Sequence, residues 1–281
     1  MVAFSIDTEG GKIIPERKED KELEGILKQI ETWQPISEEI KRRLLVLNMH
    51  PMTEGESNRE RGSNLRHTLE VYKYCQKMIE TLPELQPIEK ELKLAALTHD
   101  IGKSGPDFDP DNYTAREKIT GFASMRLFSL LESKDEEVLA EQKIEDVLKK
   151  HVSKEEAEFI MENLSNLGLT PDDLMRDFYN THLNNTIDIL RNGRVPEKVV
   201  WIAGNHHAYG RLKDEEMPSG IDEKTTELLN KASLVLQIVD SFEAAKARVD
   251  MSDSENIERL LERYKDNEVA KEIIEKVPSI I

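Results

Sequence analysis

The chain of 281 residues carries a formal net charge of −17, with 38% apolar and 34% charged residues. This length suits one large domain, or one domain with additions, and supplies enough apolar residues for a real core. The acidic balance argues against nonspecific nucleic-acid binding, because an acidic surface repels the phosphate backbone. It does not exclude an anionic small molecule held by local cations in a cleft.

Nearly every periodic segment predicts a helix, so the expected fold class is all-α: a helical bundle with N-terminal helices and a helical insertion. Residues 1–20 read as a loose tail with a strand-like VAFSI, and residues 21–48 as one or two helices broken at Pro35. A polar loop at 50–63 follows. Helices are then expected over 64–82, with Ser63 or Asn64 as N-cap, and over 88–102, ending at Gly102.

The region from about 107 to 165 predicts amphipathic, acidic helices, which form either a lid over a site or a solvated excursion. Thr170–Pro171–Asp172 predicts the N-cap of the next helix, and Gly193 its end. Further helices are expected within 195–210 and 223–250. We therefore divide the chain into N-terminal helices (1–60), a main domain (61–250) with its insertion at about 107–165, and a C-terminal helical segment (251–281).

The single cysteine, Cys75, excludes a disulfide within the chain and favours a reducing compartment. Acidic residues interrupt the start of the chain, which therefore lacks the pattern of a signal peptide. The longest apolar run, ASLVLQIV, is far shorter than the ~20 residues that span a membrane. We expect a cytoplasmic protein without a membrane partner, in which Cys75 is a small core residue.

Five histidines and two aspartates lie in or beside predicted helices. Imidazoles and carboxylates suit Zn²⁺, Fe, Mn²⁺ or Ni²⁺, and a carboxylate can bridge two ions. A water between two such ions loses a proton near neutral pH and becomes a nucleophile for phosphorus. An aspartate that follows an apolar run also needs a partner when it is buried. The candidate ligands are His67, His99, Asp100, His182, His206, His207 and Asp240; His50 and His151 are expected at the surface.

The order of His67, the His99–Asp100 pair and Asp240, with HDIGK intact, resembles the HD-domain superfamily of metal-dependent phosphohydrolases. The segments AALTHDIGKSG, VPEKVVWIAGNHH and LVLQIVDSFEAAKA resemble those of its HD-GYP branch. The resemblance covers about 60–105 and 168–250 and implies an all-α HD-domain bundle with a binuclear metal site.

The resemblance also implies roles for single residues. One divalent transition metal ion would be held by His67, His99, Asp100 and Asp240. Asp100 would bridge to a second ion held by His182 and His206, with His207 as a further ligand or a substrate-facing donor. The metal (Fe, Mn, Zn or Ni) stays open.

Asp100 and Lys103 are the expected catalytic residues. Lys103 matches the family lysine after the HD pair and would contact a phosphate oxygen in the transition state. Arg211, Lys246 and Arg248 are further candidates for binding a phosphate-containing small-molecule substrate. The expected activity is that of a phosphodiesterase, in which a metal-activated hydroxide attacks the phosphorus of a nucleotide or cyclic nucleotide.

Two departures from the HD-GYP pattern matter. The paired histidines continue as HHAYGRLKDEEMP, so the GYP loop is missing and the inference to cyclic di-GMP is weakened. Ser63 stands where trinuclear members carry a Glu, which favours two metals over three. Two alternatives stay open: a di-iron oxygenase resembling inositol oxygenase, which uses a similar ligand set, and a sensor that binds a nucleotide without cleaving it.

Overall fold

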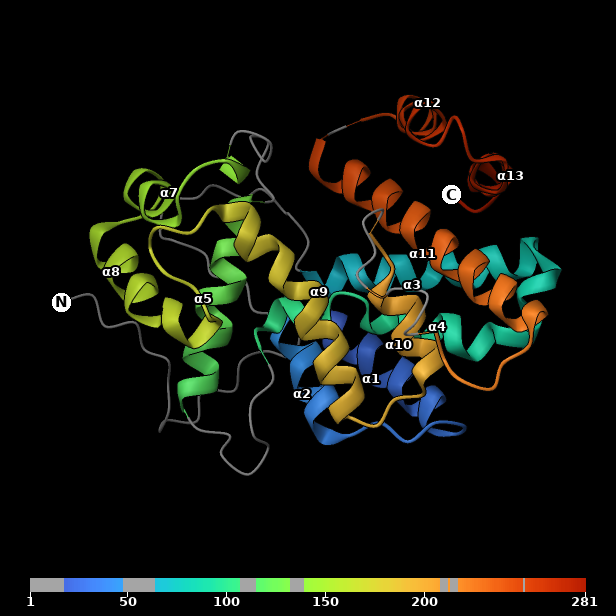
Figure 1. The fold of residues 1–281 in the computed structure, drawn as a ribbon, viewed down its shortest axis with the longest axis horizontal. Helices are drawn as coiled ribbons and strands as arrows, with labels where there is room; N and C mark the ends of the chain where they lie inside the picture. Colours follow the sequence, from blue (N-terminus) through green and yellow to red (C-terminus); the bar gives the residue numbers. More distant parts are fainter. Residues whose placement is uncertain are drawn as a thin grey trace.

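The computed structural model describes residues 18–47, 64–106, 115–131, 139–207, 212, 217–249 and 251–281. Within these ranges the chain forms α-helices and short 3-10 helices and no strand, which confirms the all-α fold class. Figure 1 shows the helices in two groups, with α9 (Met175–Asn192) lying between them. The strand-like segment VAFSI and the expected cap Ser63 lie outside the described residues.

The N-terminal helices are α1 (Lys18–Glu31) and α2 (Glu38–Val46), separated at Pro35 as predicted. The Ser37 hydroxyl accepts a hydrogen bond from the Ile40 amide and caps the first turn of α2. The apolar faces of both helices pack into the main core, which includes Leu23 and Leu44. This segment is therefore covered by the rest of the protein along one side.

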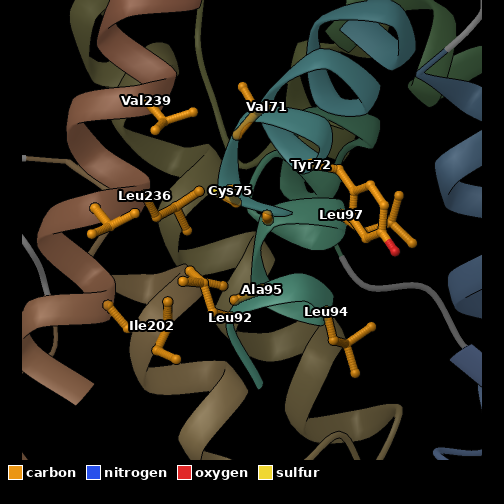
Figure 2. Packing of buried hydrophobic residues seen from close by; sticks show 14 of the residues in the cluster. Val71, Tyr72, Cys75, Leu92, Leu94, Ala95, Leu97, Ile202, Leu236 and Val239 are labelled. Atoms are coloured by element: carbon orange, nitrogen blue, oxygen red, sulfur yellow. The ribbon is translucent and has the colours of Figure 1, made fainter. Parts of the chain in front are cut away.

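The larger group surrounds α4 (Glu89–Thr98). It contains α3 (Asn64–Thr81), the 3-10 helix η1 (Pro83–Ile88), α10 (Glu197–Gly204) and α11 (Glu223–Val249). Figure 2 shows apolar side chains of α4, including Leu92 and Ala95, packed among those of α3, α10 and α11. Cys75 lies in this core, where burial raises the pKa of its thiol. The core holds the ends of these helices in fixed positions.

The smaller group is the predicted insertion. It comprises α5 (Ala115–Leu131), α7 (Ile144–His151), α8 (Lys154–Asn163) and the 3-10 helix η4 (Leu164–Leu167). These helices form a second apolar core with the first turn of α9, and the fully buried Arg126 and Glu156 form an ion pair that joins α5 to α8. The insertion is thus helical, as predicted, and contains its own core.

The start of α9 corrects one prediction. The helix begins at Met175 rather than at the Thr170–Pro171–Asp172 cap. The Thr170 hydroxyl donates to the Asp173 carboxylate within a turn, and Ile144 donates its amide to the Asp173 carbonyl. The expected cap residues therefore belong to a turn that pairs with the start of α7. This contact joins distant segments, so a local sequence pattern does not predict it. The other end agrees with the prediction, because Gly193 caps α9.

The C-terminal segment forms α12 (Asp253–Arg263), α13 (Glu268–Lys276) and the 3-10 helix η6 (Val277–Ser279). Apolar residues of α12 and α13, including Leu260 and Ile273, pack into the main core against α11. The buried Asn256 amide also donates to the Phe242 carbonyl of α11 at 2.7 Å. The boundaries 1–60, 61–250 and 251–281 stay a prediction. Among the described helices, none has the length and apolar character needed to cross a bilayer.

Candidate metal centre

The His99–Asp100 pair lies at the junction between α4 and the 3-10 turn η2 (Ile101–Ser104). The Thr186 hydroxyl of α9 donates to the His99 carbonyl and accepts from the Gly102 amide, both at 3.0 Å. A Cβ at position 102 would lie 2.0 Å from the His182 carbonyl oxygen. Glycine is therefore required at position 102, because α9 approaches the backbone of the turn too closely for any side chain.

The residues after Lys103 are held from two other helices. The buried guanidinium of Arg43, in α2, donates to the Ser104 hydroxyl at 3.1 Å and to the Gly105 and Pro106 carbonyls at 3.2 and 2.8 Å. Ser124, in α5, donates to the Lys103 carbonyl at 2.8 Å. The N-terminal helices and the insertion thus both fix the turn that carries Asp100 and Lys103.

A first group of ligand atoms gathers around one oxygen of Asp100. The Nε2 atoms of His67 and His99 lie 3.6 and 3.5 Å from Asp100 Oδ2. Asp240 Oδ1, from the middle of α11, lies 2.9 Å from His67 Nε2 and 3.7 Å from His99 Nε2. Three helix segments that are far apart in the chain therefore bring four candidate ligands together.

A second group gathers around the other oxygen of Asp100. The Nε2 atoms of His182 and His206 lie 3.8 and 3.7 Å from Asp100 Oδ1. The Nε2 atoms of His182 and His207 face each other at 3.1 Å. The two oxygens of Asp100 are thus divided between the two groups, which is the placement that a bridging carboxylate requires.

The spacing of these atoms fits metal ions. Ligand atoms about 2.0–2.1 Å from one tetrahedral ion lie about 3.3 Å from one another, and the separations given above are 2.9–3.8 Å. His182, His206 and His207 offer nitrogens that all lie within 4.8 Å of one another, as do the ligand atoms of His67, His99 and Asp100. The His and Asp clusters could therefore hold metal.

Two of the nitrogens also lack other partners. Within the described part of the chain, the buried Nε2 atoms of His99 and His206 make no hydrogen bond. Buried polar atoms are nearly always hydrogen-bonded in folded proteins. A metal ion in the shared space would satisfy both lone pairs, so the donor set fits the ions that the sequence implies.

For four of the candidate ligands, the electrostatic environment favours the protonation state that can bind a metal ion. Burial lowers the pKa of His182 to about 3 and holds the pKa of His207 well below its usual value, so both imidazoles are neutral. Burial alone would raise the pKa of Asp100, but the Lys103 ammonium and the His99 ring hold it well below the usual value. Hydrogen bonding to His67 likewise outweighs burial and lowers the pKa of Asp240. Neutral imidazoles and ionised carboxylates are the forms that bind metal ions.

His67 differs from the other histidines. Burial lowers the pKa of its ring, but the carboxylates of Glu243 and Asp240 outweigh burial and raise that pKa to about 10. A cation at His67 Nε2 therefore competes with a proton, which makes occupation of the first group dependent on pH.

Lys103 is buried beside the cluster. Its ammonium lies 2.8 Å from Asp100 Oδ2 and 3.3 Å from Asn64 Oδ1, and it stands over the Phe128 ring at 5.5 Å from the centroid. Phe128 belongs to α5 of the insertion, and its ring meets the His182 ring edge-on at 5.7 Å. The insertion therefore contacts both the lysine and the second group of ligands.

Of the remaining candidate cations, the structure describes the side chain of Lys246 and does not place it at the cluster. Lys246 is exposed, pairs with Asp253 of α12 at 3.2 Å and lies over the Phe242 ring. The side chains of Arg211 and Arg248 lie outside the described residues. Substrate binding by these three residues stays a prediction.

Sequence reasoning missed two contributors to this site. Glu243 contacts the ring of His67 from α11, and Arg43 holds the turn after Lys103. The position of Glu243, three residues after Asp240, was a usable signal, because helical residues at this spacing share a face. Arg43 gives no such signal, since a basic residue in an amphipathic helix is ordinary.

Comparison with protein families gives one result that bears on this geometry. Residues 64–174 match the family model described as HD domain. Comparison with curated proteins and with solved structures gave no match. HD domains are in general metal-dependent phosphohydrolases, and their fold is all-α. The matched segment contains His67, His99, Asp100 and Lys103, so this part of the chain is similar to an HD domain.

Proposed function

We propose that this protein is a phosphodiesterase of the HD-GYP-like kind that acts on a nucleotide or cyclic nucleotide with two divalent transition metal ions. The observation that carries this proposal is that the two carboxylate oxygens of Asp100 face different groups of imidazoles. Its Oδ2 faces His67 and His99, and its Oδ1 faces His182 and His206. A carboxylate placed between two imidazole groups suits a pair of ions that share a ligand.

The ions would be held in two sets. His67, His99 and Asp240 would hold one ion, and the second would be held by the three imidazoles opposite, with Asp100 shared. When bound, such ions supply a water of lowered pKa and polarise a phosphoryl oxygen. Fe, Mn, Zn and Ni all accept these ligands, so availability decides which metal is used.

Lys103 would neutralise the substrate. Its ammonium is buried and already paired with Asp100, so its position is set before a substrate arrives. A fixed positive charge in a buried site stabilises negative charge that develops on phosphate oxygens, and does so without reorganisation. This local cation offsets the acidic balance of the whole chain, which would otherwise repel an anionic substrate.

His207 favours hydrolysis over oxygenation. Its Nε2 lies 3.1 Å from that of His182, so the paired histidines contribute a second nitrogen to the same group. In the ligand set of the alternative, a di-iron oxygenase, a single histidine stands where this chain has the pair His206–His207, so the pair favours the hydrolase. We therefore propose His207 as a ligand or as a donor to the substrate.

The test is hydrolysis of bis-p-nitrophenyl phosphate and of a panel of linear and cyclic nucleotides after loading with Mn²⁺, Fe²⁺, Zn²⁺ or Ni²⁺. Asp100→Ala should abolish turnover, because it removes a ligand of both ions. Asp188→Ala, an exposed aspartate on α9, is the control and should retain the wild-type rate. Absence of turnover across the panel with every metal, or full activity of Asp100→Ala, would contradict the proposal.

A further inference from the structure

Three of the site histidines share one way of orienting their rings. The Nδ1 atoms of His99, His182 and His206 face the carbonyl oxygens of Ala96, Tyr179 and Ala203, at 2.9, 2.5 and 2.6 Å. In each case the carbonyl belongs to the residue three positions earlier. An Nδ1–H donated to a carbonyl fixes the tautomer whose Nε2 lone pair is free for a metal.

His67 uses a different partner. Its Nδ1 contacts the Oε2 atom of Glu243, which belongs to α11, while its Nε2 faces Asp240 and Asp100. Of the four rings compared, this one alone has a carboxylate rather than a carbonyl behind it.

The placement of Glu243 follows from the helix. Asp240 and Glu243 are three residues apart in α11, so both carboxylates lie on the face that meets α3. One carboxylate contacts the Nε2 edge of the His67 ring, and the other contacts its Nδ1 edge. Glu243 is only 9% exposed, and a buried carboxylate is costly unless a donor satisfies it.

We infer that Glu243 is a positioning residue for the first metal ion. It accepts the Nδ1–H of His67, holds the ring with its Nε2 toward Asp100 and Asp240, and makes that nitrogen a stronger donor to a cation. This inference rests on the metal centre proposed above. It predicts an asymmetry, because the ion held by His67 depends on a charged partner from another helix and the ion held by His182 and His206 does not.

Substitution at Glu243 separates this role from a structural one. Glu243→Ala removes the acceptor and should weaken the binding of one ion by about 10- to 100-fold, the range seen when such partners are lost. Glu243→Gln retains an acceptor oxygen without the charge and should give a smaller loss. Glu227→Gln, an exposed glutamate on the same helix, should behave as wild type. The affinity of the second ion should stay within about twofold in every variant.

The measurements are calorimetric titration of the metal-free protein with Mn²⁺ and Co²⁺, and nitrogen-15 NMR of the histidine rings. A selective loss at one of two sites, with a changed His67 tautomer signal in Glu243→Ala, supports the inference. Two sites of wild-type affinity in Glu243→Ala overturn it, as does an equal loss at both sites. Thermal unfolding in EDTA checks that each variant is folded.

This experiment distinguishes the inference from the proposed function. A wild-type protein that binds no metal overturns both. A wild-type protein that binds two ions but hydrolyses no phosphate ester overturns the phosphodiesterase proposal, while the selective effect of Glu243→Ala still supports the positioning role.

Discussion

Substitution of Gly102 by alanine tests whether the close approach of α9 to the HD turn builds the site. The new Cβ would lie 2.0 Å from the His182 carbonyl oxygen and 2.5 Å from the Thr186 nitrogen. Both neighbours are backbone atoms, so no side chain can rotate away, and α9 must move by about 1 Å to restore a tolerable contact. Overpacking of this kind costs about 1–3 kcal/mol.

The displacement also breaks the hydrogen bonds through the Thr186 hydroxyl, which join Gly102 and His99 to α9. Each such bond contributes about 1 kcal/mol, so the total loss in the free energy of unfolding should be about 3–5 kcal/mol. The Nε2 of His182 would move with the helix. A misplacement of about 1 Å costs about 100-fold in a preorganised site, and the second ion should lose affinity on that scale.

The assay is urea denaturation of the metal-free protein, followed by Mn²⁺ titration under conditions where the variant is folded. Gly25→Ala is the matched control, because its Cβ would meet nothing within 4 Å on the exposed side of α1. That change should stabilise the protein by about 0.5–1 kcal/mol, since glycine disfavours helices. The reasoning is refuted if the free energy of unfolding of Gly102→Ala lies within about 1 kcal/mol of the wild-type value and the variant binds two ions with wild-type affinity.

Three further predictions follow from buried ionisable side chains. Arg126→Met should lower the free energy of unfolding by about 3–5 kcal/mol, because it leaves the Glu156 carboxylate buried without its ion-pair partner. The double change Arg126→Met/Glu156→Leu should recover most of that loss. Equal stability of Arg126→Met and wild type in urea denaturation would contradict this prediction. Arg43→Met should lower the free energy of unfolding by about 1.5–3 kcal/mol, because the charged hydrogen bonds to the turn at 104–106 are lost. Amide hydrogen exchange should become faster in that turn. Unchanged exchange would be evidence that Arg43 does not hold the turn. The metal-free protein should lose stability as the pH falls from 6.5 to 4.5, by about 1.4 kcal/mol per unit for His182, because the unfolded ring binds a proton there and the folded ring, with its pKa of about 3, does not. Urea denaturation at several pH values measures this slope, and a flat profile would disprove it.

The sequence indicated most of the helices and the residue types of the candidate site. Helical periodicity indicated the α-helices, Pro35 the break between the first two, and Gly193 the end of α9. The histidines and aspartates indicated a metal site because they are residue types that bind metal ions and because some of them follow apolar runs. Asp240, for example, follows an apolar run in α11. These properties are local, so a pattern in the chain can reveal them.

Only the tertiary structure decided how these residues are arranged. The two oxygens of Asp100 face different imidazole groups because α3, α9, α10 and α11 all pack around the end of α4. Glu243 meets His67 across 176 positions of sequence, and Arg43 reaches the turn after Lys103 from α2. The start of α9 was mispredicted because Asp173 and Leu174 pair with Ile144 and Lys143 at the start of α7. Such contacts depend on how helices pack rather than on the residues within any one of them, so the sequence could name candidate ligands but not the positions of Glu243 and Arg43 around them.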